Sequence, residues 1–304
     1  MFLWGFTAIL GKAITLPAFP LVWWRMTLVT VALMLVRRFW TGLARMSLRL
    51  IATYAGIGVV VAMHWLTFYG SIKLSNASVA VTCMALAPVL IAFIEPALVG
   101  RPFDVRELFF GLAVIPGVAL VVGGTPAEMR AGIAIGVLSA FFVAIFGSLN
   151  KRFIGAGEAL SVTGLEMGAG AVCITLVAPL LPASEAVFVM PNRHDAILLF
   201  VLAIGCTLLP FALSLVALRQ LTAFTTALAV NMEPVYAILL AIILLGEQHE
   251  LGPAFYAGVA IIFVVVFSHP LLVRGHRAAP VDAILVADGG AATGQPGAGT
   301  SDSA

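Results

Sequence analysis

The sequence predicts an all-α integral membrane protein built from ten transmembrane helices. Of its 304 residues, 62% are hydrophobic and 10% are charged, whereas charged residues make up about 25% of a soluble domain. Apolar runs long enough to cross a hydrocarbon core of about 30 Å follow one another from Met1 to about Leu272. The stretches between them are too short for a soluble domain. The net charge of +2 includes no basic block that would indicate nucleic-acid binding.

Each expected helix is an apolar run bounded by glycine, proline or charged residues. The three cysteines, Cys83, Cys173 and Cys206, lie inside these runs at spacings that match no metal site, so we interpret them as small packing residues. The first run lacks a basic n-region and contains Lys12, which favours a membrane helix over a signal peptide. The expected helices span residues 2–18, 20–39, 48–73, 76–99, 105–124, 129–151, 159–181, 196–219, 223–246 and 253–273.

The distribution of basic residues predicts that both ends of the chain are cytoplasmic (N-in, C-in). Cytoplasmic loops of membrane proteins are enriched in lysine and arginine. With the N-terminus inside, only Lys73, Arg130 and Arg193 fall in outer loops. The tail, residues 278–304, is rich in alanine and glycine and is expected to be a disordered cytoplasmic segment. Eleven basic residues fall on the inner side: Arg37, Arg38, Arg45, Arg49, Arg101, Arg106, Lys151, Arg152, Arg219, Arg274 and Arg277.

The two halves of the chain resemble each other. A shift of 146 residues pairs Gly100 with Gly246, and a shift of 141 pairs Arg25 with Glu166. We therefore expect one five-helix repeat over residues 1–124 and a second over residues 129–273. Because five is odd, the second copy must enter the membrane from the opposite side, which gives an inverted repeat of the kind found in many transporter folds.

A longer motif in the second half carries a family resemblance. The run from Asn231 to Glu247 reads Asn-Met-Glu-Pro-Val-Tyr-Ala-Ile-Leu-Leu-Ala-Ile-Ile-Leu-Leu-Gly-Glu, and Gly258 follows in the next helix. On these residues the chain resembles the EamA family of the drug/metabolite transporter superfamily, over nearly its whole length except the tail. Matching positions in the first half are Ser75-Asn-Ala-Ser, Ala87-Pro-Val, Val99-Gly, Trp4-Gly and Arg25.

The resemblance implies a ten-helix, two-repeat fold that alternates access to a central cavity for amino acids, metabolites, nucleotide-linked sugars or drugs. Three positions depart from the family pattern. Arg101 stands where a glutamate is usual, and Glu233 replaces a small or polar residue before Pro234. Only three residues precede Trp4, so we expect a short first helix and a first repeat truncated at its N-terminus.

Ionisable side chains inside a membrane span cost roughly 2.5 to 3.5 kcal/mol on insertion scales, so they are candidates for function. Arg25 and Glu166 occupy equivalent positions in the two repeats, and we predict a salt bridge between them that acts as a gate or substrate clamp. The alternative is that Arg25 lies near the outer interface and snorkels. Glu95 is expected to pair with Arg101 or Arg106 and is left out of the site. The five residues considered are Lys12, Arg25, Glu95, Glu166 and Glu233.

Glu233, beside Asn231 and directly before Pro234, is the favoured position for a solute or proton site. Proline removes a backbone donor and frees a carbonyl one turn earlier, so polar groups gather where a broken helix lines a cavity. In the alternative, Glu233 satisfies backbone groups or pairs with Lys12. Lys12 itself is a candidate for holding a carboxylate or changing protonation, against ordinary placement at the membrane interface.

Aromatic residues on the third expected helix complete the candidate site. His64 and Phe68, and likewise Trp65 and Tyr69, are separated by four residues and can share one helix face. An aromatic wall with one imidazole would suit an amphipathic or cationic solute. The alternative is ordinary packing or interface anchoring. The glycine pairs Gly132–Gly136 and Gly164–Gly168 are interpreted as close helix contacts.

Together these features favour a secondary transporter, an exporter or exchanger, in the bacterial inner membrane. Its partners would be a small solute, membrane lipid and a proton as coupling ion; no cofactor or metal is expected. An intramembrane enzyme is the first alternative, but His249-Glu250 lacks the second histidine of a zinc motif, so we predict no enzymatic activity. A channel or structural membrane protein is the second alternative, although no ring of filter residues is visible.

Overall fold

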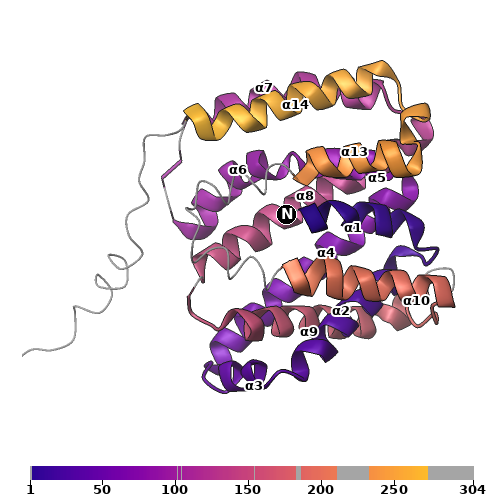
Figure 1. Cartoon of the computed structure of the whole chain (residues 1–304). Helices are drawn as coiled ribbons and strands as arrows, with labels where there is room; N and C mark the ends of the chain where they lie inside the picture. The colour runs from indigo at the N-terminus through magenta and orange to yellow at the C-terminus, as the bar shows by residue number, and fades with distance from the viewer. Residues whose placement is uncertain are drawn as a thin grey trace, which may run out of the picture.

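The computed structural model describes residues 2–100, 102–103, 105–153, 155–182, 186–210 and 233–272. Within these ranges all regular structure is helical, without a strand, which confirms the predicted fold class at that level. Figure 1 shows the long helices running side by side across the molecule. Asn231 and the tail at 278–304 lie outside the described residues, as do parts of the helices expected at 196–219 and 223–246.

The first half of the chain contains seven helical segments in the described residues. Helix α3 turns by 90° from α2, and α5 and α6 together form one apolar span, Ala77–Val99. The segments are α1 (Phe2–Ala13), α2 (Ala18–Met34), α3 (Arg37–Leu43), α4 (Leu48–Leu74), α5 (Ala77–Met84), α6 (Ala87–Val99) and α7 (Val105–Gly123).

The second half follows the same plan, with a local change of helix type. The eighth expected span begins as an α-helix, α10, and continues as a π-helix, η4. The segments are η1 (Ala127–Met129), α8 (Arg130–Arg152), α9 (Ala159–Val177), η2 (Ala178–Leu180), α10 (Arg193–Phe200), η4 (Val201–Leu208), α13 (Glu233–Leu245), η5 (Glu247–His249) and α14 (Pro253–Leu272).

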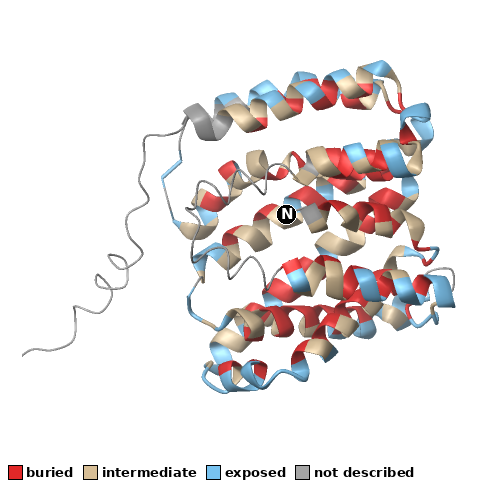
Figure 2. Ribbon diagram, in the orientation of Figure 1, coloured by how far each residue is buried: buried red, intermediate tan, exposed pale blue. Residues whose placement is uncertain are grey.

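Four helical stretches of the described chain are long and apolar enough to cross a membrane: Leu48–Leu74, Ala77–Val99, Ala127–Arg152 and Ala159–Leu180. The bent pair formed by α2 and α3 would be a fifth. Large apolar side chains also face outward on several helices, for example Leu176 at 73% exposure and Ile243 at 75%. Figure 2 shows that exposed residues of all types lie along the outer helices. This surface suits lipid rather than water. The ten-helix count and the N-in, C-in orientation stay predictions.

Equivalent helices of the two halves pack in pairs. α2 packs on α9, α5 on α13, and α7 on α14; Figure 1 shows the α7–α14 pair along one edge and α2 with α9 toward the other. Other contacts occur twice. The contact of α1 with α13 corresponds to that of α8 with α5 and α6 in the other half. Likewise, the contact of α4 with α9 corresponds to that of η4 with α2. This exchange of partners is what a twofold relation between the halves produces.

Small residues allow the close packing, as expected for helices in lipid. A Cβ added to Gly132 would lie 2.6 Å from Ser75, and one added to Gly164 would lie 2.5 Å from the Phe39 ring. The predicted close contacts at these glycines are therefore confirmed. Gly100 and Gly246, the pair found by the repeat, have φ angles of 78° and 70°. Both follow the last turn of equivalent helices, where the left-handed conformation favours glycine.

Candidate functional site

Arg25 of α2 is buried inside the helix bundle, with 3% of its surface exposed. Its Nη1 donates to the hydroxyl of Tyr69 on α4 at 2.5 Å, and its Nε and Nη2 donate to Thr207 Oγ1 at 3.0 and 2.8 Å. The guanidinium carbon lies 3.7 Å from the centre of the Trp65 ring, in the geometry of a cation–π contact. Arg25 therefore does not snorkel to an interface, and its described hydrogen-bond acceptors are neutral.

Thr207 is the member of this cluster that sequence reasoning missed. It lies in the π-helix η4, and its hydroxyl donates to the carbonyl of Leu202, five residues earlier, at 2.9 Å. Because that proton is committed to Leu202, the oxygen must accept from Arg25. π-Helical turns are frequent at functional sites. The one sequence signal was a lone hydroxyl in the apolar segment Val201–Leu208.

The predicted aromatic residues of α4 divide between two neighbours. Trp65 and Tyr69 contact the Arg25 guanidinium. His64 instead turns toward α8, where its Nδ1 lies 2.8 Å from Ser139 Oγ, and its ring centre lies 6.0 Å from that of Phe68. The i, i+4 pairing of His64 with Phe68 is thus present. The four residues form one continuous aromatic face whose two pairs have different partners.

Glu233 is the first residue of α13 and lies near enough to the Arg25 guanidinium to interact with it electrostatically. The alternative, in which Glu233 pairs with Lys12, does not occur among the described contacts. The Lys12 ammonium instead donates to the carbonyl of Ser75 at 3.2 Å, and nearby Lys73 donates to the carbonyl of Ile14. Lys12 therefore lies at the end of α4 and apart from the Arg25 cluster.

Glu166 of α9 lies against α4 rather than near Arg25. Its backbone packs on Gly58, where an added Cβ would meet the Glu166 carbonyl oxygen at 2.2 Å. Only 6% of the residue is exposed, and its Oε1 has no hydrogen-bond partner in the part of the chain that the structure describes. A carboxyl group in such surroundings is costly to ionise, so Glu166 is a candidate for a group that carries a proton.

The predicted salt bridge between Arg25 and Glu166 is wrong. Helices α2 and α9 run antiparallel, because Trp23 Nε1 donates to Thr175 Oγ1 at 2.9 Å while Ser161 Oγ donates to the carbonyl of Phe39 at 2.8 Å. Arg25 is therefore level with residue 173, and Glu166 lies seven residues further along, or about 10 Å at 1.5 Å per residue. An inverted repeat places equivalent residues at opposite depths unless they sit at the midplane.

Glu95 has a described partner, and its expected pairing with Arg101 or Arg106 stays a prediction. Its carboxylate forms an ion pair with Lys151 of α8, whereas Arg101 and the side chain of Arg106 lie outside the described residues. The exclusion of Glu95 from the candidate site agrees with this position between α6 and α8.

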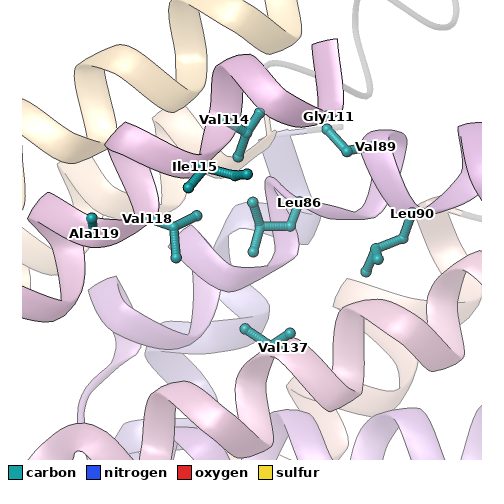
Figure 3. A pocket seen from close by; sticks show the side chains of 9 residues that line it. All are labelled: Leu86, Val89, Leu90, Gly111, Val114, Ile115, Val118, Ala119 and Val137. Carbon is teal, nitrogen blue, oxygen red and sulfur yellow. The ribbon is translucent and has the colours of Figure 1, made fainter. Parts of the chain in front are cut away.

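A cavity of about 370 Å³ lies between α6, α7 and α8, away from the Arg25 cluster. Figure 3 shows the side chains that point into it from these helices, and all are apolar. Such a lining offers no polar group to orient a polar solute. The residues are Leu86, Val89, Leu90, Gly111, Val114, Ile115, Val118, Ala119 and Val137.

Comparison with known proteins decides the family. The EamA-like transporter family matches the chain twice, over residues 1–123 and 130–269. The chain belongs to the EamA-like transporter family. This EamA chain is accordingly an integral membrane protein of the drug/metabolite transporter superfamily with a two-repeat architecture, as the motif residues predicted.

A search of solved structures supports the same fold for this EamA chain. One crystal structure, described only as that of a protein, aligns with a TM-score of 0.57 and 20% sequence identity. The alignment covers 90% of the EamA chain and 95% of the other. A search of curated proteins gives no match.

Proposed function

We propose that this EamA chain is a secondary transporter that moves a small solute across the bacterial inner membrane by alternating access, as an exporter or exchanger. The observation that carries the proposal is the buried Arg25 guanidinium, held by Tyr69, Thr207 and Trp65. Burying a cation in a membrane bundle is unfavourable. Packing would be better served by an apolar side chain, so the charge supports a role toward a ligand.

The solute site that we propose is centred on this cluster. Arg25, Trp65 and Tyr69 would contact the solute directly, with Glu233 as a nearby charge. His64 and Phe68 extend the aromatic face of α4. Asn231 precedes Glu233 and is proposed as a further contact on sequence grounds, and Lys12 as a residue at the approach to the site.

Glu166 is the proposed proton site, separate from the solute cluster. Its unpartnered Oε1 is buried where α9 meets α4. A carboxyl group that is neutral when buried and ionised when it reaches water is suited to coupling proton movement to a change in access. We expect the two sites to lie at different depths, because the Glu166 and Arg25 layers are about 10 Å apart along α9.

The test is solute flux in proteoliposomes with and without a pH gradient. We expect flux above that of empty liposomes, and stimulation by the gradient. Glu166→Gln should abolish the stimulation while exchange without a gradient persists, and Glu233→Gln should lower flux under both conditions. Glu128→Gln, at an exposed carboxylate in η1, is the control and should match the parent.

Two results would count against the proposal. If both Glu166→Gln and Glu233→Gln transport like the parent, the site assignment is wrong. If the purified protein converts a lipid or peptide and no solute crosses the bilayer, the protein is an intramembrane enzyme and the transporter proposal fails.

A further inference from the structure

Among the described residues, the hydrogen bonds of Arg25 leave part of its guanidinium without an acceptor. An arginine side chain has five N–H donors in a fixed planar fork. Three of them are used, because Nε and Nη2 share Thr207 Oγ1 and Nη1 bonds Tyr69. One N–H on Nη1 and one on Nη2 have no acceptor among the described residues. These two nitrogens form the pair that binds a planar oxyanion with two parallel hydrogen bonds.

The partners of Arg25 hold the fork in one orientation. Thr207 Oγ1 accepts from the Nε side because its own proton is used by Leu202. The Trp65 ring covers one face of the guanidinium plane. Tyr69 Oη accepts from Nη1, so its hydroxyl proton is not used in this bond and has no acceptor among the described residues. In this part of the chain, three donors without an acceptor therefore lie beside a cation whose described hydrogen-bond acceptors are uncharged.

We propose that the transported solute carries an oxyanion, a carboxylate or a phosphate, which binds to the free donors of Arg25 and to the Tyr69 hydroxyl. This inference rests on the proposed transport function and specifies its substrate class. Arginine is suited to this role because its planar fork matches both groups, whereas a lysine presents only a point charge. Thr207 acts as a positioning residue that sets the direction of the fork.

Glu233 has a defined part in this scheme. Its carboxyl group is close enough to Arg25 to contribute a weak electrostatic attraction, and in the proposed scheme it acts as the counter-charge when no solute is bound. An incoming oxyanion replaces this interaction, so solute binding and the position of α13 become linked. A neutral or cationic solute that separated Glu233 from Arg25 would leave the guanidinium without a counter-charge.

The experiment uses proteoliposomes loaded with the low-molecular-mass filtrate of a bacterial cytoplasm, and mass spectrometry of the solutes that leave. The filtrate is tested untreated and after phosphatase treatment, which removes a phosphate substrate but leaves a carboxylate one. Once a solute is found, its concentration dependence is measured for the parent and for Arg25→Gln, Arg25→Lys and Thr207→Val.

A matched control exists in α2. Thr30 also donates its hydroxyl to a backbone carbonyl, that of Met26, at 2.8 Å, and it is buried like the site residues. Thr30→Val therefore makes the same chemical change as Thr207→Val without touching Arg25. Size-exclusion profiles of all variants identify any protein that has failed to fold, and Thr207→Val keeps the test valid if Arg25→Gln is among them.

We expect every solute that leaves faster than from empty liposomes to carry a carboxylate or phosphate. Arg25→Gln should lower uptake at sub-saturating solute by roughly tenfold or more, with a smaller loss for Arg25→Lys. Thr207→Val should raise the half-saturating concentration roughly three- to tenfold with little change in maximal rate, while Thr30→Val changes neither.

The inference is overturned if the exported solutes lack an oxyanion, or if folded Arg25→Gln and Thr207→Val proteins transport them like the parent. A different outcome separates it from the proposed function. If no solute leaves parent proteoliposomes at all, transport itself is refuted, and the oxyanion site falls with it.

Discussion

At the scale of single residues, the sequence was enough to find the buried charges of this protein. It was not enough to find the residues with which those charges interact. Arg25 and Glu166 are conspicuous as ionisable residues in apolar runs, and the repeat relates them. Their actual neighbours are separated from them by long stretches of chain; Thr207 lies 182 positions from Arg25. Such pairings depend on how helices pack. The repeat gave symmetry-related positions, which an inverted fold places at different depths.

Asp195 provides a residue-scale prediction outside the long spans. It is fully buried and accepts from the backbone N–H and hydroxyl of Thr15 at 2.9 and 2.6 Å. Burial alone would raise the pKa of its carboxyl, but the Thr15 hydrogen bonds and His194 outweigh it and hold the pKa below its usual value. The stabilisation is therefore complete above an unfolded-state pKa of about 3.9 and is lost as pH falls through the lower folded-state pKa.

We expect Asp195→Asn to lower the melting temperature of the detergent-solubilised protein at pH 7, by an amount that corresponds to about 1.5 to 3 kcal/mol. The difference between parent and variant should persist at pH 8, where the Thr15 hydrogen bonds remain, and should shrink below about pH 4. Thr15→Val, which removes one of the two Thr15 bonds, should have a smaller effect. A difference that grows on acidification would contradict the assigned role.

At the scale of elements, most helices could be predicted because hydrophobic runs and their punctuation are local signals. Side-chain caps agree with the expected starts: Ser47 accepts from the N–H of Leu50 at the start of α4, and Asn76 from that of Val79 at the start of α5. The π-helix η4 could not be predicted, because a change from i, i+4 to i, i+5 bonding has no residue signature in an apolar segment. The 90° turn between α2 and α3 likewise depends on tertiary packing.

The N-terminus of α5 gives an element-scale prediction. Glu247, in the family motif, is 1% exposed, and its two carboxylate oxygens accept from the N–H groups of Ala77 and Ser78 at 2.9 and 2.8 Å. A carboxylate at a helix N-terminus satisfies free donors and interacts favourably with the helix dipole. This contact fastens the loop after α13 to the start of α5.

Glu247→Gln should reduce stability by about 1 to 3 kcal/mol, because an amide can accept with only one atom and brings donors toward the two N–H groups. Glu250→Gln is the control: Glu250 is exposed and accepts from Asn76 Nδ2 at 2.9 Å, so its loss should cost less. Thermal unfolding of the two purified variants compares them. Equal shifts for both would show that the buried carboxylate is no more important than the exposed one.

At the scale of the whole molecule, the family, the two-repeat architecture and the membrane character all followed from the sequence. The contacts between equivalent helices, α2 with α9, α5 with α13 and α7 with α14, show how the halves interlock. A bundle of this kind can change access by moving one set of helices against the other while its polar core stays in place. The account therefore depends on the chain acting as a carrier and not as an open pore.

Counterflow in proteoliposomes tests this claim most directly, using a solute identified in the filtrate experiment. Vesicles preloaded with unlabelled solute are diluted into a trace of the labelled form. A carrier that alternates access exchanges the two, so labelled solute should accumulate transiently above its outside concentration, and Arg25→Gln should abolish the overshoot. Uptake that rises linearly with concentration and is unaffected by preloading would identify a channel and contradict the account.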